Sequence, residues 1–339
     1  MSNAASSPLP LRPRIHVLAT GGTIAGAHTG GAPGSYRSAT LSIETLVGAV
    51  PQIAEMADLA LEQVAQVGSQ DMDDALWLEL ARRAGAALAP PGVAGLVITH
   101  GTDTMEETAY FLSLAVKTTK PMVLVGAMRP ANAISADGPM NLYNAIAVAC
   151  DPGATSQGAL VVANDEIHHA RAVSKTNTTQ VGTFHSINQG LAGLVNQGRV
   201  HWFGPAGTQH TLASEFSADA RSTLPRVEIV FAHAGMDRTL IDAAVAAGAE
   251  GIVIAGVGSG NLHALARTAA AEAAAKGICI VRASRTGGGM VERSVEVDDD
   301  RFGFVAAGDL NPQKARVLLK LALTRTHSPA LIQEMFDRY

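Results

Sequence analysis

Aromatic residues make up only 4% of the 339-residue chain, so valine, isoleucine, leucine and alanine must build most of the core. Cysteine is also scarce, because Cys150 and Cys279 are the only two. They stand far apart without the spacing of metal-binding thiols, and each lies in an apolar stretch. We therefore expect buried free thiols at both positions.

The chain also lacks long apolar runs and an excess of either charge. No apolar segment approaches the roughly 20 residues that cross a bilayer, since glycine, proline or charge interrupts each alanine-rich stretch. The 25 basic and 30 acidic residues give a net charge of -5, which offers no positive surface for nucleic acid or an anionic membrane. We expect neither partner, and the sequence favours a small-molecule substrate.

A secretory signal is missing as well. Residues 1–13 are small, polar and proline-containing, without the apolar segment that export requires. The sequence as written therefore predicts a cytoplasmic protein, and a removed signal peptide would leave the periplasm as the alternative.

Short β-branched or apolar runs alternate with longer helical patterns from Arg14 onward, which predicts an α/β fold on a largely parallel sheet. A hairpin is expected over 191–203, and helices are expected over 74–88 and 264–275. A further helix is expected to begin at a capping box formed by Asp103 and Glu106 and to run through Ala115. Strands are expected at 15–19, 59–67, 95–99, 122–125, 159–163, 227–231, 251–255 and 278–282.

The chain length suggests two domains. Residues 204–224 are rich in glycine, proline, serine, threonine and alanine and show no apolar periodicity. We therefore place a larger N-terminal catalytic α/β domain at 14–205, a linker at 206–225 and a smaller C-terminal parallel-sheet domain at 226–339.

Four loops follow the carboxyl ends of predicted strands, where open parallel sheets bind ligands. They span residues 20–26, 68–71, 100–104 and 256–261, and each combines glycine with hydroxyl, amide or carboxylate side chains. Glycine lets the backbone approach a ligand closely and leaves N–H groups to stabilise an oxyanion. The hydroxyls beside these glycines are candidate nucleophiles.

A threonine hydroxyl needs a base or a nearby cation before it becomes a good nucleophile. Lys175 is a candidate for this role, because a desolvated lysine accepts a proton near neutral pH. Each feature also has a simpler interpretation. The Gly-Gly-Thr sequence can be a tight turn, Thr102 and Asp103 can cap a helix, and Lys175 can be a surface lysine.

Neither a metal nor a cofactor is expected. The glycines between 21 and 26 fit neither template for nucleotide binding. His100, His168 and His169 occur without an HExxH motif or a spaced cluster of cysteine and histidine, and we interpret them as structural or as supports of the site.

Several long segments closely resemble bacterial type II L-asparaginases, and together they cover nearly the whole chain. In order they are TGGTIAG at 20–26, GSQDM at 68–72, ITHGTDTMEETAYFL at 98–112, GAMRP at 126–130, SADGPMNLYNA at 135–145, SKTNTT at 174–179, AGVGSGNL at 255–262, EVDD at 296–299 and LNPQKARVLL at 310–319. The resemblance implies an amidohydrolase that converts L-asparagine to L-aspartate and ammonia. It also implies two α/β domains per subunit and a homotetramer.

The resemblance further implies catalytic roles. Thr23 matches the primary nucleophile of the family, and Tyr36 matches the residue that orients it from a loop over the site. Thr102, Asp103 and Lys175 match a second catalytic group that activates a nucleophile or water.

Substrate binding is implied in the same way. Ser69, Gln70 and Asp103 match groups that hold the α-carboxylate and α-amino ends of the substrate. Asn261 and Glu296 match residues of the second domain that reach the active site of a neighbouring subunit. The resemblance thus implies active sites that are shared between subunits.

Departures from the family pattern bear on specificity and location. Gln70 and Asn261 stand where glutaminase-asparaginases often carry glutamate and serine, which favours asparagine with only weak glutaminase activity. Ser259 replaces an asparagine common among relatives, so the degree of glutamine rejection stays open. Neither Cys150 nor Cys279 aligns with the disulfide of exported members, which favours the cytoplasm.

Other functions remain as alternatives. A dual-specificity glutaminase-asparaginase is one of them. An ammonia-releasing amidotransferase subunit is another, although such subunits usually carry an extra domain before the TGGT motif, and only 19 residues precede Thr20 here. A non-catalytic amino-acid sensor is the third, and the joint presence of Thr23, Thr102, Asp103 and Lys175 argues against it.

Overall fold

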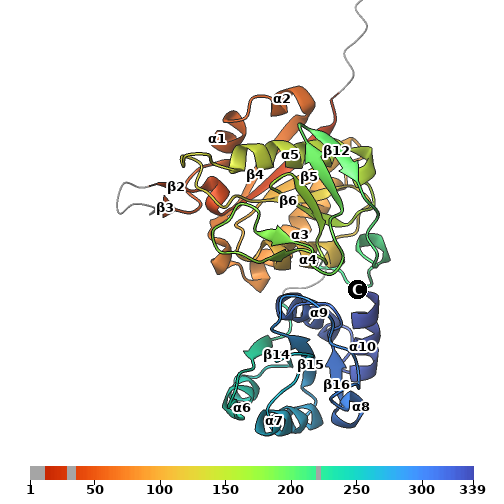
Figure 1. Ribbon diagram of the computed structural model, residues 1–339. Coiled ribbons are helices and arrows are strands. Elements are labelled where there is room, and N and C mark those ends of the chain that lie inside the picture. Colours follow the sequence, from red (N-terminus) through yellow and green to blue (C-terminus); the bar gives the residue numbers. More distant parts are fainter. Residues whose placement is uncertain (1–11, 29–35, 219–222) are drawn as a thin grey trace, which may run out of the picture.

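The computed structural model describes residues 12–28, 36–218 and 223–339. It contains two α/β units, coloured red to green and teal to blue in Figure 1, and each is built around its own sheet. The last strand of the first sheet ends at Trp202 and the first strand of the second begins at Val227. The α/β class predicted from the sequence is therefore confirmed.

The first unit has an eight-stranded sheet in the order β12-β11-β8-β7-β6-β5-β1-β4. Strands β4, β1, β5, β6 and β7 run parallel, and β8, β11 and β12 extend one edge with antiparallel pairing. The bounds are Arg14–Gly21 for β1, Asp58–Val67 for β4, Val93–Thr99 for β5, Met122–Val125 for β6, Ala159–Ala163 for β7, Glu166–His169 for β8, Gly193–Asn196 for β11 and Arg199–Trp202 for β12.

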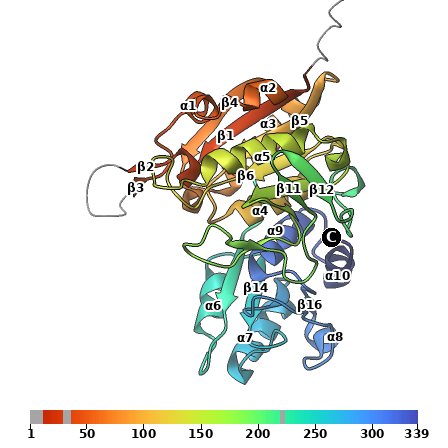
Figure 2. The same cartoon turned by 45° about the horizontal axis from the view of Figure 1, so that its top comes forward.

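Both faces of the central strands β1, β5, β6 and β7 are buried, because these strands are apolar at consecutive positions. Leu18 and Ile98 pack on the face covered by α3 and α4, whereas Val17 and Val97 pack on the face covered by α1, α2 and α5. Figure 2 shows α5 lying across the sheet. The helices span Ile43–Gly48 (α1), Ile53–Met56 (α2), Asp74–Leu88 (α3), Met105–Ala115 (α4) and Gly138–Cys150 (α5).

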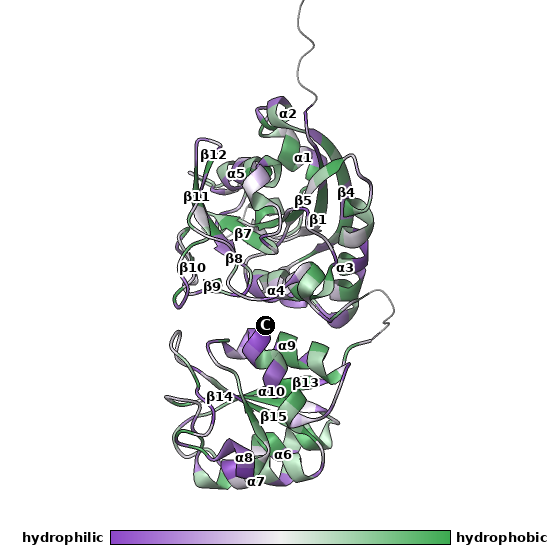
Figure 3. Cartoon of the chain, turned by 90° about the vertical axis from the view of Figure 1, so that its right-hand side faces the viewer, coloured by the Kyte–Doolittle hydropathy of each residue, from purple (hydrophilic) through white to green (hydrophobic). Residues whose placement is uncertain are grey.

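The second unit has a four-stranded parallel sheet in the order β13-β14-β15-β16. Helices α6 and α7 pack on one face, and α9 and α10 lie between the other face and α4 of the first unit (Figure 3). The bounds are Val227–Phe231 (β13), Thr239–Ala246 (α6), Gly251–Gly256 (β14), Ala264–Ala275 (α7), Cys279–Ser284 (β15), Asp299–Phe302 (α8), Phe304–Ala306 (β16), Pro312–Leu323 (α9) and Pro329–Arg338 (α10).

The two units are joined by a continuous apolar contact. One cluster of buried side chains extends from α3 and α4 into α9 and α10, and it includes Leu112 and Leu318. The Tyr110 hydroxyl donates a hydrogen bond across the junction to the Tyr339 carbonyl at 3.0 Å. Helix α9 is thus fixed against the first unit.

Two short ribbons complete the first unit. β2 (Ala27–His28) pairs with β3 (Tyr36–Arg37), and β9 (Ser174–Lys175) pairs with β10 (Phe184–His185). Neither ribbon was expected from the sequence, since strands of two residues leave no periodic pattern.

Most predicted elements are confirmed. Each of the eight expected strands is present with both ends within two residues of the predicted positions, and the hairpin is formed by β11 and β12. The capping box is wrong, because the residue that precedes α4 is Thr104, which makes no side-chain cap. Asp103 bonds Lys175 instead, and Glu106 is buried against the second unit.

Within the described residues no helix is long and apolar enough to cross a membrane. Both cysteines carry free thiols, as predicted, but only Cys279 is fully buried while Cys150 is half-buried.

Candidate active site

The loop after β1 is shaped by two glycines with positive φ. Gly21 has a φ of 111° and Gly22 a φ of 82°, which side chains with a β-carbon rarely adopt. The Gly22 N–H donates to the Val67 carbonyl at 3.0 Å, so the chain turns beside the end of β4. A short 3-10 turn, Thr23–Ala25, begins directly afterwards and leaves Thr23 half-buried at the carboxyl edge of the sheet.

The loops after β4 and β5 are fastened to each other through Ser69. Ser69 is buried, and its hydroxyl oxygen accepts a hydrogen bond from the Asp103 backbone N–H at 3.1 Å. In return the Thr104 hydroxyl donates to the Ser69 carbonyl at 2.8 Å. Gln70 is exposed, and its side chain folds back over Gly68 and contacts Asp71.

His100 supports this arrangement as a neutral residue. Burial lowers the pKa of its imidazole to about 4. Because a carbonyl only accepts, Nδ1 must carry the proton in its 2.7 Å contact with the Gly101 oxygen, and Nε2 then accepts from Thr108 at 3.0 Å. The Trp77 indole N–H completes the chain by donating to the Thr108 hydroxyl at 2.9 Å. This geometry agrees with a structural role for His100.

Lys175 joins the loop after β5 from the β9-β10 ribbon. Its Nζ donates to Thr102 Oγ1 at 2.9 Å and forms an ion pair with Asp103 Oδ1 at 2.5 Å. Thr102 is 5% exposed and the Lys175 side chain 15%, whereas the Asp103 carboxylate is 60% exposed. A lysine amine therefore lies in hydrogen-bond contact with a buried hydroxyl, and the charged partner faces the cleft.

A cleft of about 290 Å³ opens where these loops meet. Its polar lining can hydrogen-bond a small zwitterion, since it combines three hydroxyls, an amide, a carboxylate and backbone N–H groups. The lining residues are Gly22, Thr23, Ser38, Gly68, Ser69, Gln70, Gly101 and Asp103.

The structure thus brings together most of the site residues expected from the sequence. Thr23, Ser69, Gln70 and Asp103 line one cleft, and Thr102 and Lys175 are bonded to its edge. The Tyr36 backbone lies in β3, but its side chain is outside the described part of the chain.

Asn261 and Glu296 are not part of the cleft within a single chain. They lie in the second unit, where the Asn261 amide donates to the Glu296 carboxylate. Arg282 holds the surrounding loops, because it donates to the Ser259 and Gly260 carbonyls and forms a fully buried ion pair with Asp299 at 2.6 Å.

Sequence reasoning missed Ser38 and misassigned Glu106. Ser38 lies beyond a glycine-rich loop and carries no motif of its own. Glu106 was expected to cap α4, but its carboxylate accepts hydrogen bonds from Asn311 at 2.8 Å and from the Lys175 N–H at 3.5 Å. An acidic residue in the first turn of a helix gives no signal for a partner more than 200 residues away.

A hydroxyl-lined cleft at the ends of parallel strands, with a lysine bonded to a threonine hydroxyl at its edge, is an arrangement suited to a hydrolase that uses a hydroxyl nucleophile. Residues 14–207 match the family described as asparaginase, N-terminal, and residues 226–336 match the glutaminase/asparaginase C-terminal domain. The chain belongs to the L-asparaginase family.

Individual relatives agree with this assignment. The chain is 48% identical over 327 residues to L-asparaginase 2 of Escherichia coli, covering 96% of this chain and 93% of the relative. A glutaminase-asparaginase of Pseudomonas fluorescens is 43% identical, with 96% and 90% covered. A solved structure of a probable cytoplasmic L-asparaginase from Campylobacter jejuni has a TM-score of 0.91 at 43% identity, covering 97% of this chain and 100% of that one.

Proposed function

We propose that this protein hydrolyses the side-chain amide of L-asparagine to L-aspartate and ammonia, with Thr23 as the nucleophile. The Thr23 oxygen attacks the amide carbon, ammonia leaves with a proton from the site, and water then releases aspartate from the threonine ester. The oxyanion would be stabilised by backbone N–H groups of the loops after β1 and β5, since Gly22 and Gly101 line the cleft, although the Gly22 N–H itself is bonded to Val67.

Thr102, Asp103 and Lys175 form the second catalytic group in this proposal. The observation that carries it is the position of the Lys175 amine, 2.9 Å from Thr102 Oγ1 and 2.5 Å from the Asp103 carboxylate. As a base, the Lys175 amine would have to act in its deprotonated form, taking a proton from Thr102 or from water, and Asp103 stabilises the ammonium that results. Tyr36 is included in the proposal as the residue that orients Thr23, on the resemblance to the family alone.

Substrate selection follows from the lining of the cleft. Ser69 and backbone N–H groups bind the α-carboxylate, and the Asp103 carboxylate binds the α-ammonium with Gln70 beside it. A free amino acid offers both groups, whereas an asparagine within a peptide offers neither. Glutamine is longer by one methylene, so we expect it to be hydrolysed weakly but detectably.

Asn261 and Glu296 act in a neighbouring subunit under this proposal, and the active enzyme is a homotetramer with shared sites. Exposed apolar side chains on the second unit are compatible with burial against another copy. Phe231, Leu265, Met290 and Val295 are each more than half exposed, and Val295 adjoins Glu296.

Mixing of inactive variants tests the shared site. Thr23→Ala and Glu296→Ala subunits are each expected to be inactive as homotetramers. Reassembled together, they form some sites with Thr23 from one subunit and Glu296 from the other, so ammonia release from asparagine should reappear. Persistent inactivity of a mixture that light scattering shows to be tetrameric would contradict the proposal.

We further propose that the protein works in the cytoplasm. Burial raises the pKa of the Cys150 thiol to about 11 and that of Cys279 to about 12, so both are poor nucleophiles, and neither forms a disulfide. Among the relatives, one from Haemophilus influenzae is named a probable periplasmic L-asparaginase, and the Campylobacter jejuni protein is named a probable cytoplasmic one. Fractionation of cells, followed by assay of each compartment, tests the location.

A further inference from the structure

Lys175 lies on a strand that is too short to hold it in place. β9 contains only Ser174 and Lys175, and it pairs with the two residues of β10. A two-stranded ribbon is marginally stable on its own. The Lys175 amine is nevertheless held at 2.9 Å from Thr102 Oγ1, so other contacts must fix its backbone.

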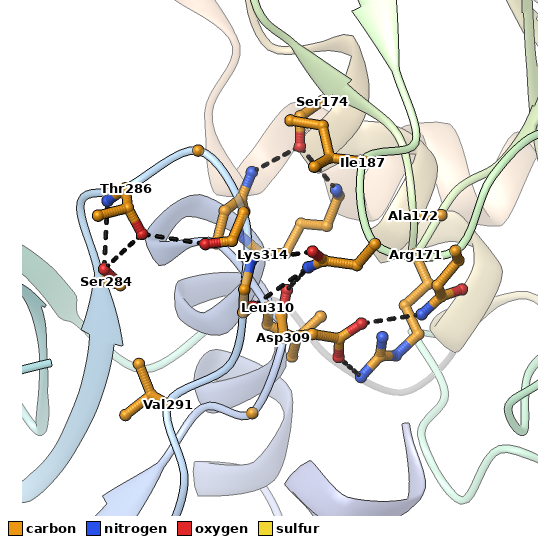
Figure 4. Close-up of a pocket in the computed structure, with 17 residues that line it drawn as sticks. Arg171, Ala172, Ser174, Ile187, Ser284, Thr286, Val291, Asp309, Leu310 and Lys314 are labelled. Atoms are coloured by element: carbon orange, nitrogen blue, oxygen red, sulfur yellow. Dashed lines mark hydrogen bonds and ion pairs between the residues drawn. The ribbon is translucent and has the colours of Figure 1, made fainter. Parts of the chain in front are cut away.

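The N-terminus of α9, in the second unit, provides these contacts. The Lys314 amine donates to the Val173 carbonyl and lies 3.5 Å from the Ser174 hydroxyl oxygen. The Asn311 amide donates to the same Ser174 oxygen at 3.1 Å. Figure 4 shows the Lys314 side chain directed toward Ser174, with a dashed line between them. The two residues just before Lys175 are thus bound to another domain.

Glu106 connects α9 directly to Lys175. One carboxylate oxygen accepts from the Lys175 backbone N–H at 3.5 Å, and the other accepts from Asn311 at 2.8 Å and lies 3.4 Å from the Lys314 amine. Glu106 is 5% exposed and Lys314 2% exposed. Burial lowers the pKa of Lys314, and the Glu106 carboxylate opposes this shift. Two buried charges of opposite sign therefore stabilise each other around the Lys175 backbone.

We propose that Asn311 and Lys314 are positioning residues for Lys175, so that the second domain sets the geometry of the second catalytic group in its own subunit. The inference rests on the catalytic role proposed for Lys175. Loss of either residue loosens β9 and displaces the Lys175 amine from Thr102. Because a misplacement of about 1 Å can cost roughly 10²-fold in rate, we expect a lower kcat. KM should change less than kcat, since Ser69 and Gln70 lie on another loop and the Asp103 backbone stays bonded to Ser69.

Asn311→Ser is the sharpest variant. Asn311 Oδ1 caps α9 by accepting from the Lys314 N–H at 2.9 Å, and serine can keep that cap. Serine loses the amide that reaches Glu106 and Ser174. Lys314→Met is the second variant, and it removes the amine while it keeps most of the side-chain volume.

Lys320→Met is the matched control. Lys320 lies on the same helix, is 3% exposed, and also crosses between the domains with an ion pair to Asp74 at 2.6 Å. Its hydrogen bonds go to Asp74 and the Pro225 carbonyl, not to β9. Its loss should lower the free energy of unfolding without a selective effect on kcat.

The experiment compares kcat and KM for asparagine with the unfolding midpoint in the full-length tetramer of each variant. We expect Asn311→Ser and Lys314→Met to lower kcat about 10- to 100-fold with KM within about threefold of the parent, and Lys320→Met to keep both. A parental kcat in Asn311→Ser, or an equal fall of kcat in Lys320→Met, would overturn the inference. Lys175→Met separates the catalytic role proposed for Lys175 from the positioning role proposed for Asn311 and Lys314. Full activity of Lys175→Met would refute the catalytic role itself, whatever the Asn311 and Lys314 variants show.

Discussion

Gly22 and Gly101 bring the loops after β1 and β5 into direct backbone contact. A β-carbon on Gly22 would lie 2.3 Å from the Gly101 Cα and 2.4 Å from its nitrogen. No side chain fits between the two loops. Thr23 is thereby held beside the loop that carries Thr102 and Asp103, and the cleft owes its shape to this contact.

The variant Gly22→Ala should therefore lose both stability and activity. A left-handed φ costs roughly 1–2 kcal/mol for a residue with a β-carbon, and overpacking adds about 1–3 kcal/mol. Gly190→Ala is the control, because Gly190 has a φ of 77° but a β-carbon there would meet no atom within 4 Å. Denaturant unfolding should show a larger loss of unfolding free energy for Gly22→Ala than for Gly190→Ala. The kcat should fall in Gly22→Ala alone. Equal losses in the two variants would contradict the role of the contact.

Replacement of Lys175 tests proton transfer. Lys175→Met should lower kcat by about 10²- to 10⁴-fold, the usual contribution of a general base. Lys175→Arg keeps the positive charge, but arginine stays protonated and cannot accept a proton, so it should be nearly as inactive. Steady-state ammonia release measures both. Normal activity of Lys175→Arg would leave only an electrostatic role for this residue.

Glu107 predicts a pH dependence of stability. Burial raises the pKa of its carboxyl to about 7, against the opposing effect of Arg316. Between the ordinary carboxyl pKa of about 4.5 and pH 7, the folded protein keeps a proton that the unfolded chain has lost, so stability falls as pH rises through this window. Across this window the free energy of unfolding should fall by on the order of 3 kcal/mol. Urea unfolding of Glu107→Gln should lack this fall, and an unchanged pH profile in that variant would refute the assignment.

Specificity should depend on Gln70. One methylene in a fitted pocket is worth about 1–3 kcal/mol, so the parent should prefer asparagine over glutamine by roughly 10- to 200-fold in kcat/KM. Gln70→Glu adds a negative charge beside the substrate ammonium and should narrow that preference. Gln52→Glu adds the same charge at the exposed start of α2, outside the set of residues that line the cleft, and should leave the preference for asparagine unchanged. Parallel assays with both amides give the ratio, and an unaltered ratio in Gln70→Glu would remove Gln70 from the explanation.

The sequence predicts the sheets well because buried parallel strands have a strong local signature. Apolar β-branched runs such as Met122–Val125 and Ala159–Ala163 are bounded by glycine, proline or polar residues, and the structure has the same bounds. The site could be predicted in outline for a related reason, since glycine and hydroxyl residues follow those strands at one edge of the sheet.

What the sequence could not predict depends on contacts between distant segments. β9 has only two residues and exists because β10 and α9 hold it, so no local pattern marks it. Glu106 follows Asp103 at the spacing of a capping box, but tertiary contacts with Lys314 and Asn311 outweigh the local preference.

The most direct test of the whole account is ammonia release from L-asparagine by Thr23 variants. Thr23→Ala should lower kcat by at least about 10³-fold while the unfolding midpoint stays near that of the parent, because the hydroxyl serves the transition state rather than the core. Thr23→Ser keeps a hydroxyl and should retain measurable turnover. Thr23→Ala with kcat within a few-fold of the parent would contradict the assignment of Thr23 as the nucleophile.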